Sequence, residues 1–455
     1  MILPELIPHE SGIYIVGGTV RDFLMGKQPT DYDIAVHPPC EPLAHQIAKN
    51  AGSRVICLGK PGLVTYRIVA GGLTFDVAPL AGETIHHDLK RRDFTINAMA
   101  WDVEQRKLID ILNGRQDIEA QKIRMIAGDN FRSDPLRLLR AFRMGAAFEF
   151  TIDFHTLAEI RKHAHRIWEA AGERIRDELM KMLERPHSGV YLQKMDEVGL
   201  LAELFPELAP LKNCRQNEHH DFDAFEHTLT AYDRLEKIFR RPAIEFQETP
   251  ELLQTIVSDP ARLKLALLLH DIGKPACRTE DETGNTHFYR HAHIGADMAR
   301  RISQRLKLPN KHQTYLDFII RNHLKPLHLF IAHQSGTLTK KAIARFILNT
   351  RPLAADLLVH AIADARGKQN FHSPQAFALF CRQLIRAHIS DFRQSSKRPP
   401  LVNGHDLINE FNLAPSPVFA DLLARVEEER LSGNLKTRAE ALAWIKNFII
   451  RNNLT

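Results

Sequence analysis

The stretch that decides the fold is Gly17-Gly18-Thr19-Val20-Arg21-Asp22, followed by Thr30-Asp31-Tyr32-Asp33-Ile34-Ala35-Val36. Residues 13–16 form an apolar run that predicts a strand, which ends at two glycines where the backbone can turn sharply. Asp31 and Asp33 begin a second apolar strand, and residues i and i+2 of a strand point to the same face. Two carboxylates held together in this way suit Mg²⁺ and the chemistry of phosphoryl transfer. An Asp-x-Asp pair alone is compatible with a solvated strand end, but the glycine pair and the Arg-Asp at this spacing favour a metal site.

The composition is that of a multidomain protein without membrane spans. At 455 residues the chain is too long for one ordinary core, which indicates three or four domains. Apolar residues make up 44% and no apolar run approaches about 18 residues, so no span is expected. The net charge of +6 permits nucleic-acid binding without proving it. Five scattered cysteines without a Cys-x-x-Cys pair, and an N-terminus unlike a signal peptide, indicate a cytoplasmic protein.

The glycine and aspartate motifs resemble the signature of the DNA polymerase β superfamily, in particular that of bacterial CCA-adding enzymes and poly(A) polymerases. Residues 91–100, R-R-D-F-T-I-N-A-M-A, match the second motif of that family almost without change. Their arginines and asparagine can contact phosphates and ribose, with Asp93 orienting an arginine. A helix start with a basic flank is the plainer interpretation. Asp76, in a strand expected at residues 73–78, is either a third carboxylate of the site or an ordinary strand-face aspartate.

Residues 133–143 predict an amphipathic helix that begins at Pro135 with Asp134 as its cap. Its arginines recur every three residues and form one basic stripe, which could be a solvated face: Arg137, Arg140 and Arg143. Residues 173–183 resemble the later family motif E-R-x-x-x-E-L, and their apolar spacing predicts a helix whose role is packing.

The resemblance implies that Asp134 and Arg137 read the base of the incoming nucleotide. Cytosine and adenine each present an amino donor beside a ring-nitrogen acceptor, whereas uracil and guanine present a carbonyl beside an N–H. A carboxylate only accepts and an arginine only donates, so the pair accepts C or A and rejects U or G. The family usually has glutamate before this aspartate, but this chain has Ser133, so the brace on the arginine is missing or supplied elsewhere.

A second site is expected after about residue 216, where histidines become frequent. A strongly apolar helix at residues 262–269 ends in His-Asp, with one histidine upstream and one aspartate far downstream, and this pattern resembles the HD phosphohydrolase superfamily. Imidazoles with carboxylates suit a divalent metal such as Mg²⁺, Mn²⁺, Ni²⁺, Fe²⁺ or Zn²⁺. The expected ligands are His227, His270, Asp271 and Asp364. Further candidates for the site are His291, His293, His323 and Lys274. The site is either hydrolytic toward phosphoester ends or only structural.

The resemblance implies a small α+β nucleotidyltransferase head (1–145), an all-α neck for nucleotide selection and RNA binding (146–215), an all-α HD domain (216–390) and a helical tail that contacts RNA (391–455). The expected activity is template-independent addition of CMP and/or AMP, from CTP and ATP, to the 3′ end of tRNA, with Mg²⁺ on Asp31 and Asp33. The nucleotide-binding residues are predicted to be Gly17, Gly18, Arg21, Arg92, Asp93, Asp134, Arg137, Arg140 and Arg143. The alternatives are a poly(A) polymerase, a partial enzyme adding only CC or only A, and an HD phosphohydrolase with a degenerate RNA-binding head.

Overall fold

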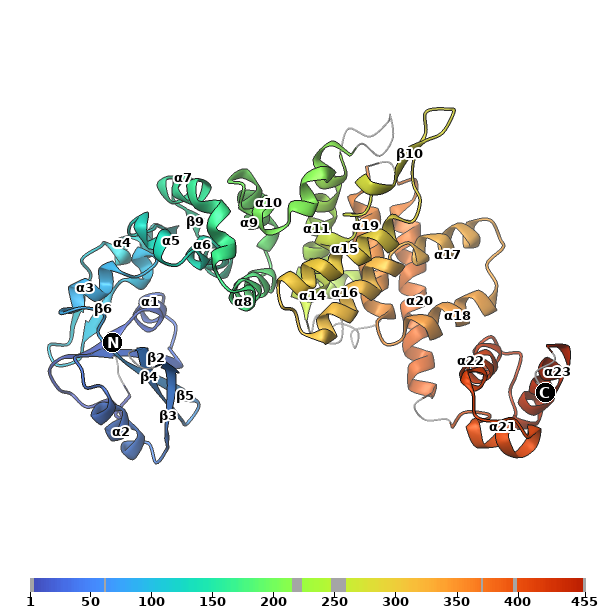
Figure 1. The fold of residues 1–455 in the computed structure, drawn as a ribbon, viewed down its shortest axis with the longest axis horizontal. Coiled ribbons are helices and arrows are strands. Elements are labelled where there is room, and N and C mark those ends of the chain that lie inside the picture. The colour runs from blue at the N-terminus through green and yellow to red at the C-terminus, as the bar shows by residue number, and fades with distance from the viewer. Residues whose placement is uncertain are drawn as a thin grey trace. The chain divides into compact units, whose positions relative to one another are not determined.

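The structure is a computed structural model that describes residues 4–60, 63–214, 223–246, 259–369, 371–395 and 399–452. The chain divides into two compact units, Met1–Pro206 and Glu207–Thr455 (Figure 1). Each unit has its own fold and its own candidate site.

The first unit begins with a mixed sheet, whose seven strands in the described residues run in the order β3-β4-β5-β2-β1-β6-β7. They are β1 Ile13–Val16, β2 Asp31–Val36, β3 Val55–Lys60, β4 Leu63–Ala70, β5 Leu73–Pro79, β6 Ala100–Asp102 and β7 Lys107–Ile109. Strand β2 pairs in parallel with β5 and antiparallel with β1, so that Asp33 lies opposite Asp76 on one side and Val16 on the other. The predicted metal site therefore lies on a central strand of the sheet.

Alternation and glycine punctuation explain the strands and turns around this site. Ile15, Ile34 and Phe75 from β1, β2 and β5 are buried in a shared core. Gly17 lies between β1 and helix α1 (Gly18–Leu24) with φ of 69°, a left-handed conformation that glycine adopts without steric cost. Helix α2 (Glu41–Asn50) packs against strands β3–β5 through buried residues that include Ile47.

Helices make up most of the rest of the first unit. They are α3 Ile85–Lys90, α4 Gly114–Glu119, α5 Asp129–Ser133, α6 Leu136–Phe148, α7 Phe154–His163, α8 Gly172–Leu183, α9 Ser188–Glu197 and α10 Leu200–Leu204. Helices α6 and α8 pack together through buried leucines such as Leu139 and Leu179. Short 3-10 helices lie at Thr95–Asn97 and Ala164–Glu169, and a third, Pro206–Asn213, begins at the last residue of this unit.

The second unit is a helical body around the His-Asp motif, followed by a small helical bundle. Its helices are α11 Ala224–Arg240, α12 Pro242–Glu245, α14 Pro260–Leu269, α15 His291–Arg305, α16 Asn310–Asn322, α17 Lys325–Gln334, α18 Lys340–Thr350, α19 Ala354–Gly367, α20 Pro374–Ser395, α21 Gly404–Phe411, α22 Pro417–Leu431 and α23 Arg438–Arg451. A 3-10 helix lies at Pro275–Cys277. Helix α19 packs against both α11 and α20, and α22 packs against α18, as Figure 1 shows.

The predicted class, an α+β head followed by a mostly helical body, is confirmed. Two short pairs of strands inside the helical regions were not predicted. Strand β9 (Thr151–Ile152) pairs in parallel with β8 (Lys122–Ile123), and β10 (Arg278–Glu280) forms a hairpin with β11 (Thr286–Phe288). Strands of two or three residues are too short to show an alternating pattern. The expectation that helices alone fill residues 146–215 is therefore wrong at β9, and the expectation of an all-α domain at 216–390 is wrong at β10 and β11.

The proposed domain boundaries stay predictions, and residues 145 and 390 lie within α6 and α20. In the described ranges, no helix combines the length and apolar character needed to cross a bilayer.

Candidate active sites

The first unit contains a polar cavity of about 400 Å³ that gathers the predicted nucleotide-binding residues. The residues that line it are Gly17, Gly18, Arg21, Asp33, Arg92, Asp93, Asn97, Asp134, Arg137, Arg140, Arg143 and Met144. All nine predicted nucleotide-binding residues are among them, together with Asp33. Met144 was not predicted, and Asn97 was expected only as part of its motif. Asp31 does not line the cavity.

Thr19 positions the strand that carries the two aspartates. Its hydroxyl donates to the main-chain carbonyl of Asp31 (2.9 Å) and accepts from the N–H of Asp33 (3.0 Å), which ties α1 to the start of β2. Asp31 and Asp33 are two residues apart on this strand and so project to the same face. Burial raises the pKa of Asp33 above its usual value, although the nearby Arg92 opposes the shift.

Asp76 is already paired with a cation. Arg67 donates to both of its carboxylate oxygens, at 2.8 and 2.7 Å. A bidentate pair of this kind satisfies the carboxylate, so the geometry favours the strand-face alternative over a third metal ligand.

Four arginines of the cavity are each held by another polar side chain, and we call them the cavity arginines: Arg21, Arg92, Arg140 and Arg143. Arg21 Nη1 donates to Asn97 Oδ1 (2.6 Å), and Arg92 pairs with Asp88 (2.8 Å). Arg140 donates to Asp93 Oδ2 through Nε (2.9 Å) and Nη2 (2.7 Å), and Arg143 pairs with Glu178 (2.6 Å). Fixed guanidinium groups of this kind are preorganised to bind phosphate oxygens.

Asp93 is buried beside Arg140, as the second motif led us to expect. Burial by itself raises the pKa of a carboxyl, but Arg140, the Asn97 amide and the Phe94 N–H hold the pKa of Asp93 below its ordinary value. Asp93 is therefore the charged partner that orients Arg140 in the cavity.

The two residues predicted to read the base both line the cavity. Their main chains are bonded, because the N–H of Arg137 donates to the carbonyl of Asp134 (3.0 Å), but their side chains have other partners. Arg137 Nη1 donates to the main-chain carbonyls of Asn130 (3.3 Å) and Arg92 (3.5 Å). Asp134 is not the helix cap that we expected, because α6 begins one residue later, with Pro135 in the cap position and no side-chain cap bond. The carboxylate of Asp134 instead accepts two hydrogen bonds from Arg174, at 3.0 and 3.3 Å.

Helix α8 does more than the packing that its motif predicted. Ile175 and Leu179 are buried as expected. However, Arg174 pairs with Asp134, and Glu178 pairs with Arg143 and lies 3.7 Å from Arg140. Two polar positions of this helix therefore contact residues that line the cavity.

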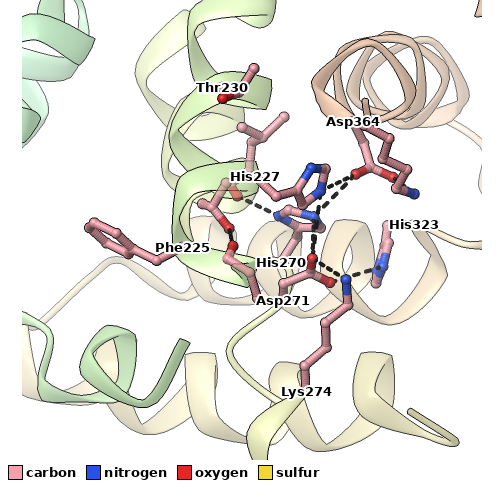
Figure 2. Close-up of polar contacts among 12 residues, drawn as sticks. Phe225, His227, Thr230, His270, Asp271, Lys274, His323 and Asp364 are labelled. Atoms are coloured by element: carbon pink, nitrogen blue, oxygen red, sulfur yellow. Dashed lines mark hydrogen bonds and ion pairs between the residues drawn. The ribbon is translucent and has the colours of Figure 1, made fainter. Parts of the chain in front are cut away.

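The second unit gathers the histidines of the His-Asp pattern around Asp271 (Figure 2). His270, His291 and His323 each donate Nδ1–H to the main-chain carbonyl three residues earlier, at 2.7 or 2.8 Å. These bonds orient the rings and leave each Nε2 facing the carboxylates, which is how metal-binding histidines are commonly held.

The ligand atoms form two groups that share Asp271. One is His227, His270 and Asp271, and the other is Asp271, His291 and His323; within each group the ligand atoms lie within 4.8 Å of one another. His270 Nε2 is 3.1 Å from Asp271 Oδ2 and 3.4 Å from Asp364 Oδ1. His227 Nε2 is 2.8 Å from Asp364 Oδ1. All four expected ligands therefore come together.

Of the further candidates for this site, three lie in the cluster and one does not. His291 and His323 join the cluster, and Lys274 pairs with Asp271 (2.7 Å), whereas His293 is exposed on α15. Sequence reasoning missed Lys368, which pairs with Asp364 (2.9 Å). It also missed His360, whose ring centre is 5.2 Å from that of His270. His360 lies on α19 and Lys368 directly follows it as its C-cap, each four residues from Asp364, so helical spacing from that aspartate could have indicated them.

The donor set of this cluster fits a divalent metal. Three of its buried ring nitrogens have no hydrogen-bond partner: His227 Nδ1 and both ring nitrogens of His360. Burial by itself lowers the pKa of His270, but Asp271 and Asp364 raise it to about 9. A proton on His270 therefore supplies positive charge where a metal would supply it, and metal binding should release that proton.

Comparison with known proteins finds family models that match segments of both units. Three family models match successive parts of the chain: the poly A polymerase head domain over residues 13–124, the probable RNA and SrmB-binding site of polymerase A over 149–212, and the HD domain over 224–365. An A-adding tRNA nucleotidyltransferase of Deinococcus radiodurans is 32% identical and covers 98% of this chain and 97% of that protein. A CC-adding tRNA nucleotidyltransferase of Thermus thermophilus is 29% identical and covers 98% of this chain and 95% of that protein.

The fold is shared with a solved structure as well. The Thermotoga maritima CCA-adding enzyme complexed with tRNA has a TM-score of 0.63 at 20% identity, over 96% of this chain and 91% of that one. The matched models follow the order of the motifs along the chain, and the full-length relatives share more than a quarter of its residues. The chain therefore belongs to the tRNA nucleotidyltransferase family.

Proposed function

We propose that the protein adds CMP, AMP or both to the 3′ end of tRNA from CTP and ATP, without a nucleic-acid template. The observation that carries this proposal is the single cavity in which Asp33, the cavity arginines and the pair Asp134 and Arg137 meet. One relative that matches nearly the whole chain is named A-adding and another is named CC-adding. An experiment must therefore decide which nucleotides this protein adds. A poly(A) polymerase and a degenerate head are not favoured, because the full-length relatives are named for tRNA.

Asp31 and Asp33 are proposed to hold Mg²⁺, a hard cation that prefers carboxylate oxygens. When bound, Mg²⁺ neutralises triphosphate charge and lowers the pKa of the attacking 3′-hydroxyl. The cavity arginines bind the phosphate oxygens and stabilise the negative charge as the 3′-oxygen bonds to the α-phosphate and pyrophosphate leaves. Because their acidic and amide partners hold them before the nucleotide arrives, they need little rearrangement.

Base selection is assigned to Asp134 and Arg137. The carboxylate accepts a hydrogen from the amino group of cytosine or adenine, and the guanidinium donates to the adjacent ring nitrogen. Uracil and guanine would instead place a carbonyl at Asp134 and an N–H at Arg137, so both contacts would be lost.

The experiment uses tRNA transcripts that end at the discriminator base, at C or at CC, incubated with Mg²⁺ and labelled CTP, ATP or both. Addition that stops after two C and one A would establish full CCA synthesis. Addition of only C, or only a final A, would establish a partial specificity. Asp31→Ala should abolish incorporation while RNA binding remains, and normal incorporation by this variant would contradict the proposal.

We also propose that the second unit is a metal-dependent phosphohydrolase, because its two ligand groups share Asp271 and gather buried imidazole and carboxylate ligand atoms. Its ligands would be His227, His270, Asp271 and Asp364, and a bound metal would supply an activated water. The test measures phosphate release from 2′,3′-cyclic phosphates and phosphomonoesters with Mg²⁺, Mn²⁺, Ni²⁺, Fe²⁺ and Zn²⁺ in turn. Release from no substrate with any of these metals would refute it.

The proposed compartment is the cytoplasm, where thiols stay reduced. All five cysteines are unpaired, and three of them are buried.

A further inference from the structure

Arg174 is the charged side chain of α8 that contacts the proposed base-reading carboxylate. We propose that Arg174 is a positioning residue that sets base specificity by fixing the orientation of Asp134. This inference rests on the proposed role of Asp134 and assigns a specificity function to a helix whose motif predicted only packing.

The contact has the geometry that fixes a carboxylate plane. Arg174 Nη1 lies 3.3 Å from Asp134 Oδ1 and Nη2 lies 3.0 Å from Oδ2, so the guanidinium donates one hydrogen bond to each oxygen. Two parallel bonds hold the carboxylate against rotation. Each carboxylate oxygen has a second lone pair, so Asp134 can still accept a hydrogen from a base while it is held.

The local backbone gives Asp134 no other support of this kind. The residue lies between α5 and α6 in an extended conformation, with φ of −146° and ψ of 93°, and its side chain caps neither helix. Among the described residues, Arg174 supplies all of the hydrogen bonds that its carboxylate accepts from other side chains. Without Arg174 the carboxylate would be free to rotate.

This arrangement also answers the question that Ser133 raised. Ser133 Oγ donates to the main-chain carbonyl of Asn130, so it does not brace either base-reading residue. Arg137 is braced by main-chain carbonyls, and Asp134 is braced by Arg174. Arg137 is thus held by the main chain and Asp134 by a side chain, and a single substitution can remove that side chain.

Specificity is more sensitive to Arg174 than stability is. The side chain of Arg174 is 54% exposed, and an exposed ion pair contributes little to the stability of a fold. A rotating carboxylate, however, meets the amino group of cytosine or adenine less often and can accept the ring N–H of uracil or guanine instead. Loss of Arg174 should therefore weaken the preference between bases before it weakens the fold.

The test compares Arg174→Ala and Arg174→Lys with the matched control Arg176→Ala. The control removes the same charge from the same helix, but Arg176 pairs with Asp177 and does not line the cavity. Calorimetric titration with CTP, ATP, UTP and GTP gives the base preference in binding, and incorporation into tRNA is measured separately. Arg174→Ala should lower the preference for C or A over U or G about tenfold, with an unchanged melting temperature. Arg174→Lys should recover part of it, because an ammonium lacks the two-pronged geometry.

A second comparison separates orientation from general effects. Asp134→Asn should lose the preference between bases. Adding Arg174→Ala to it should cause no further loss, because Arg174 acts only through the Asp134 carboxylate. An additive loss, a preference in Arg174→Ala equal to that of the wild type, or an equal loss in Arg176→Ala would each overturn the inference. So would a wild-type protein that binds all four nucleotides alike. A wild type that shows base preference in binding but adds nothing to tRNA would contradict the proposed function. The binding data would still show whether Arg174 sets the base preference.

Discussion

Replacing Asp93 by asparagine tests whether one buried ion pair holds the nucleotide cavity in shape. Asp93 is 6% exposed, and its two oxygens have different partners. Oδ1 accepts from the Asn97 amide (2.9 Å) and the Phe94 N–H (2.8 Å), whereas Oδ2 accepts both bonds from Arg140. Asparagine can place its carbonyl at the Oδ1 position, but its NH₂ group would then face the donors of Arg140. The variant therefore loses both bonds to Arg140 and keeps the other two.

The loss of unfolding free energy can be estimated from the two bonds to Arg140 that the variant lacks. Removing one partner of a buried ion pair costs about 3–5 kcal/mol, but Arg140 is 32% exposed and keeps Glu178 at 3.7 Å. We therefore expect Asp93→Asn to lose about 2–4 kcal/mol of unfolding free energy. For a unit of this size that is a fall in melting temperature of about 5–15 °C. The matched control Asp177→Asn, in an exposed pair with Arg176, should cost less than about 1 kcal/mol.

The pH dependence provides an independent check by thermal and chemical denaturation. The pKa of Asp93 is lower in the folded state than in the unfolded chain. Its contribution is thus complete above the unfolded pKa of about 4 and is lost as the pH falls through the folded pKa. The gap between wild type and Asp93→Asn should narrow in acid. A variant within 1 kcal/mol of the wild type at pH 7, or a gap that does not narrow, would refute the reasoning.

Three further predictions concern single residues. Gly17→Ala should raise the KM for nucleotides, because the new Cβ would lie 2.7 Å from Arg92 Nη1. The control Gly26→Ala has a similar φ of +75° but open space around it, so it should change only stability. Steady-state kinetics and melting temperatures distinguish the two effects. Asp271→Asn removes the carboxylate shared by both ligand groups, so dialysed protein should contain at least about tenfold less divalent metal than the wild type by elemental analysis. Burial raises the pKa of Tyr191 to about 12, so the wild type should lose stability between the ordinary tyrosine pKa of 10 and pH 12. Tyr191→Phe should lack that loss in pH-dependent denaturation, and should cost about 1–2 kcal/mol at neutral pH through its missing bond to a main-chain carbonyl.

The sequence predicted the parts of the head that local patterns encode. Apolar runs predicted β1 and β2, glycines marked the turn before α1, and the spacing of Arg137 and Arg140 identified one face of α6. Each of these signals depends only on residues close together in the chain, so it can be recognised from one sequence without knowledge of the tertiary contacts.

Long-range partners could not be predicted in the same way. Arg174 and Asp134 are 40 residues apart, and the packing of α8 against α6 brings them together. Asp134 was expected to cap a helix, which is the ordinary local role of an aspartate before proline, but a distant arginine binds its carboxylate instead. His360 is a different case, because its spacing of four residues from Asp364 is a local signal, whereas its ring contacts with His270 and His323 depend on long-range packing.

The pairing of the cavity arginines explains how one cavity can hold so much positive charge before any nucleotide is present. Asp88, Asp93 and Glu178 neutralise part of that charge and fix the direction of three guanidinium groups. Desolvation of these groups is therefore compensated during folding and need not be compensated again when a triphosphate binds. A substitution in any of these acids leaves a partly buried arginine with one counterion fewer. It follows that acids outside the reacting centre should be as sensitive to substitution as the arginines that they hold.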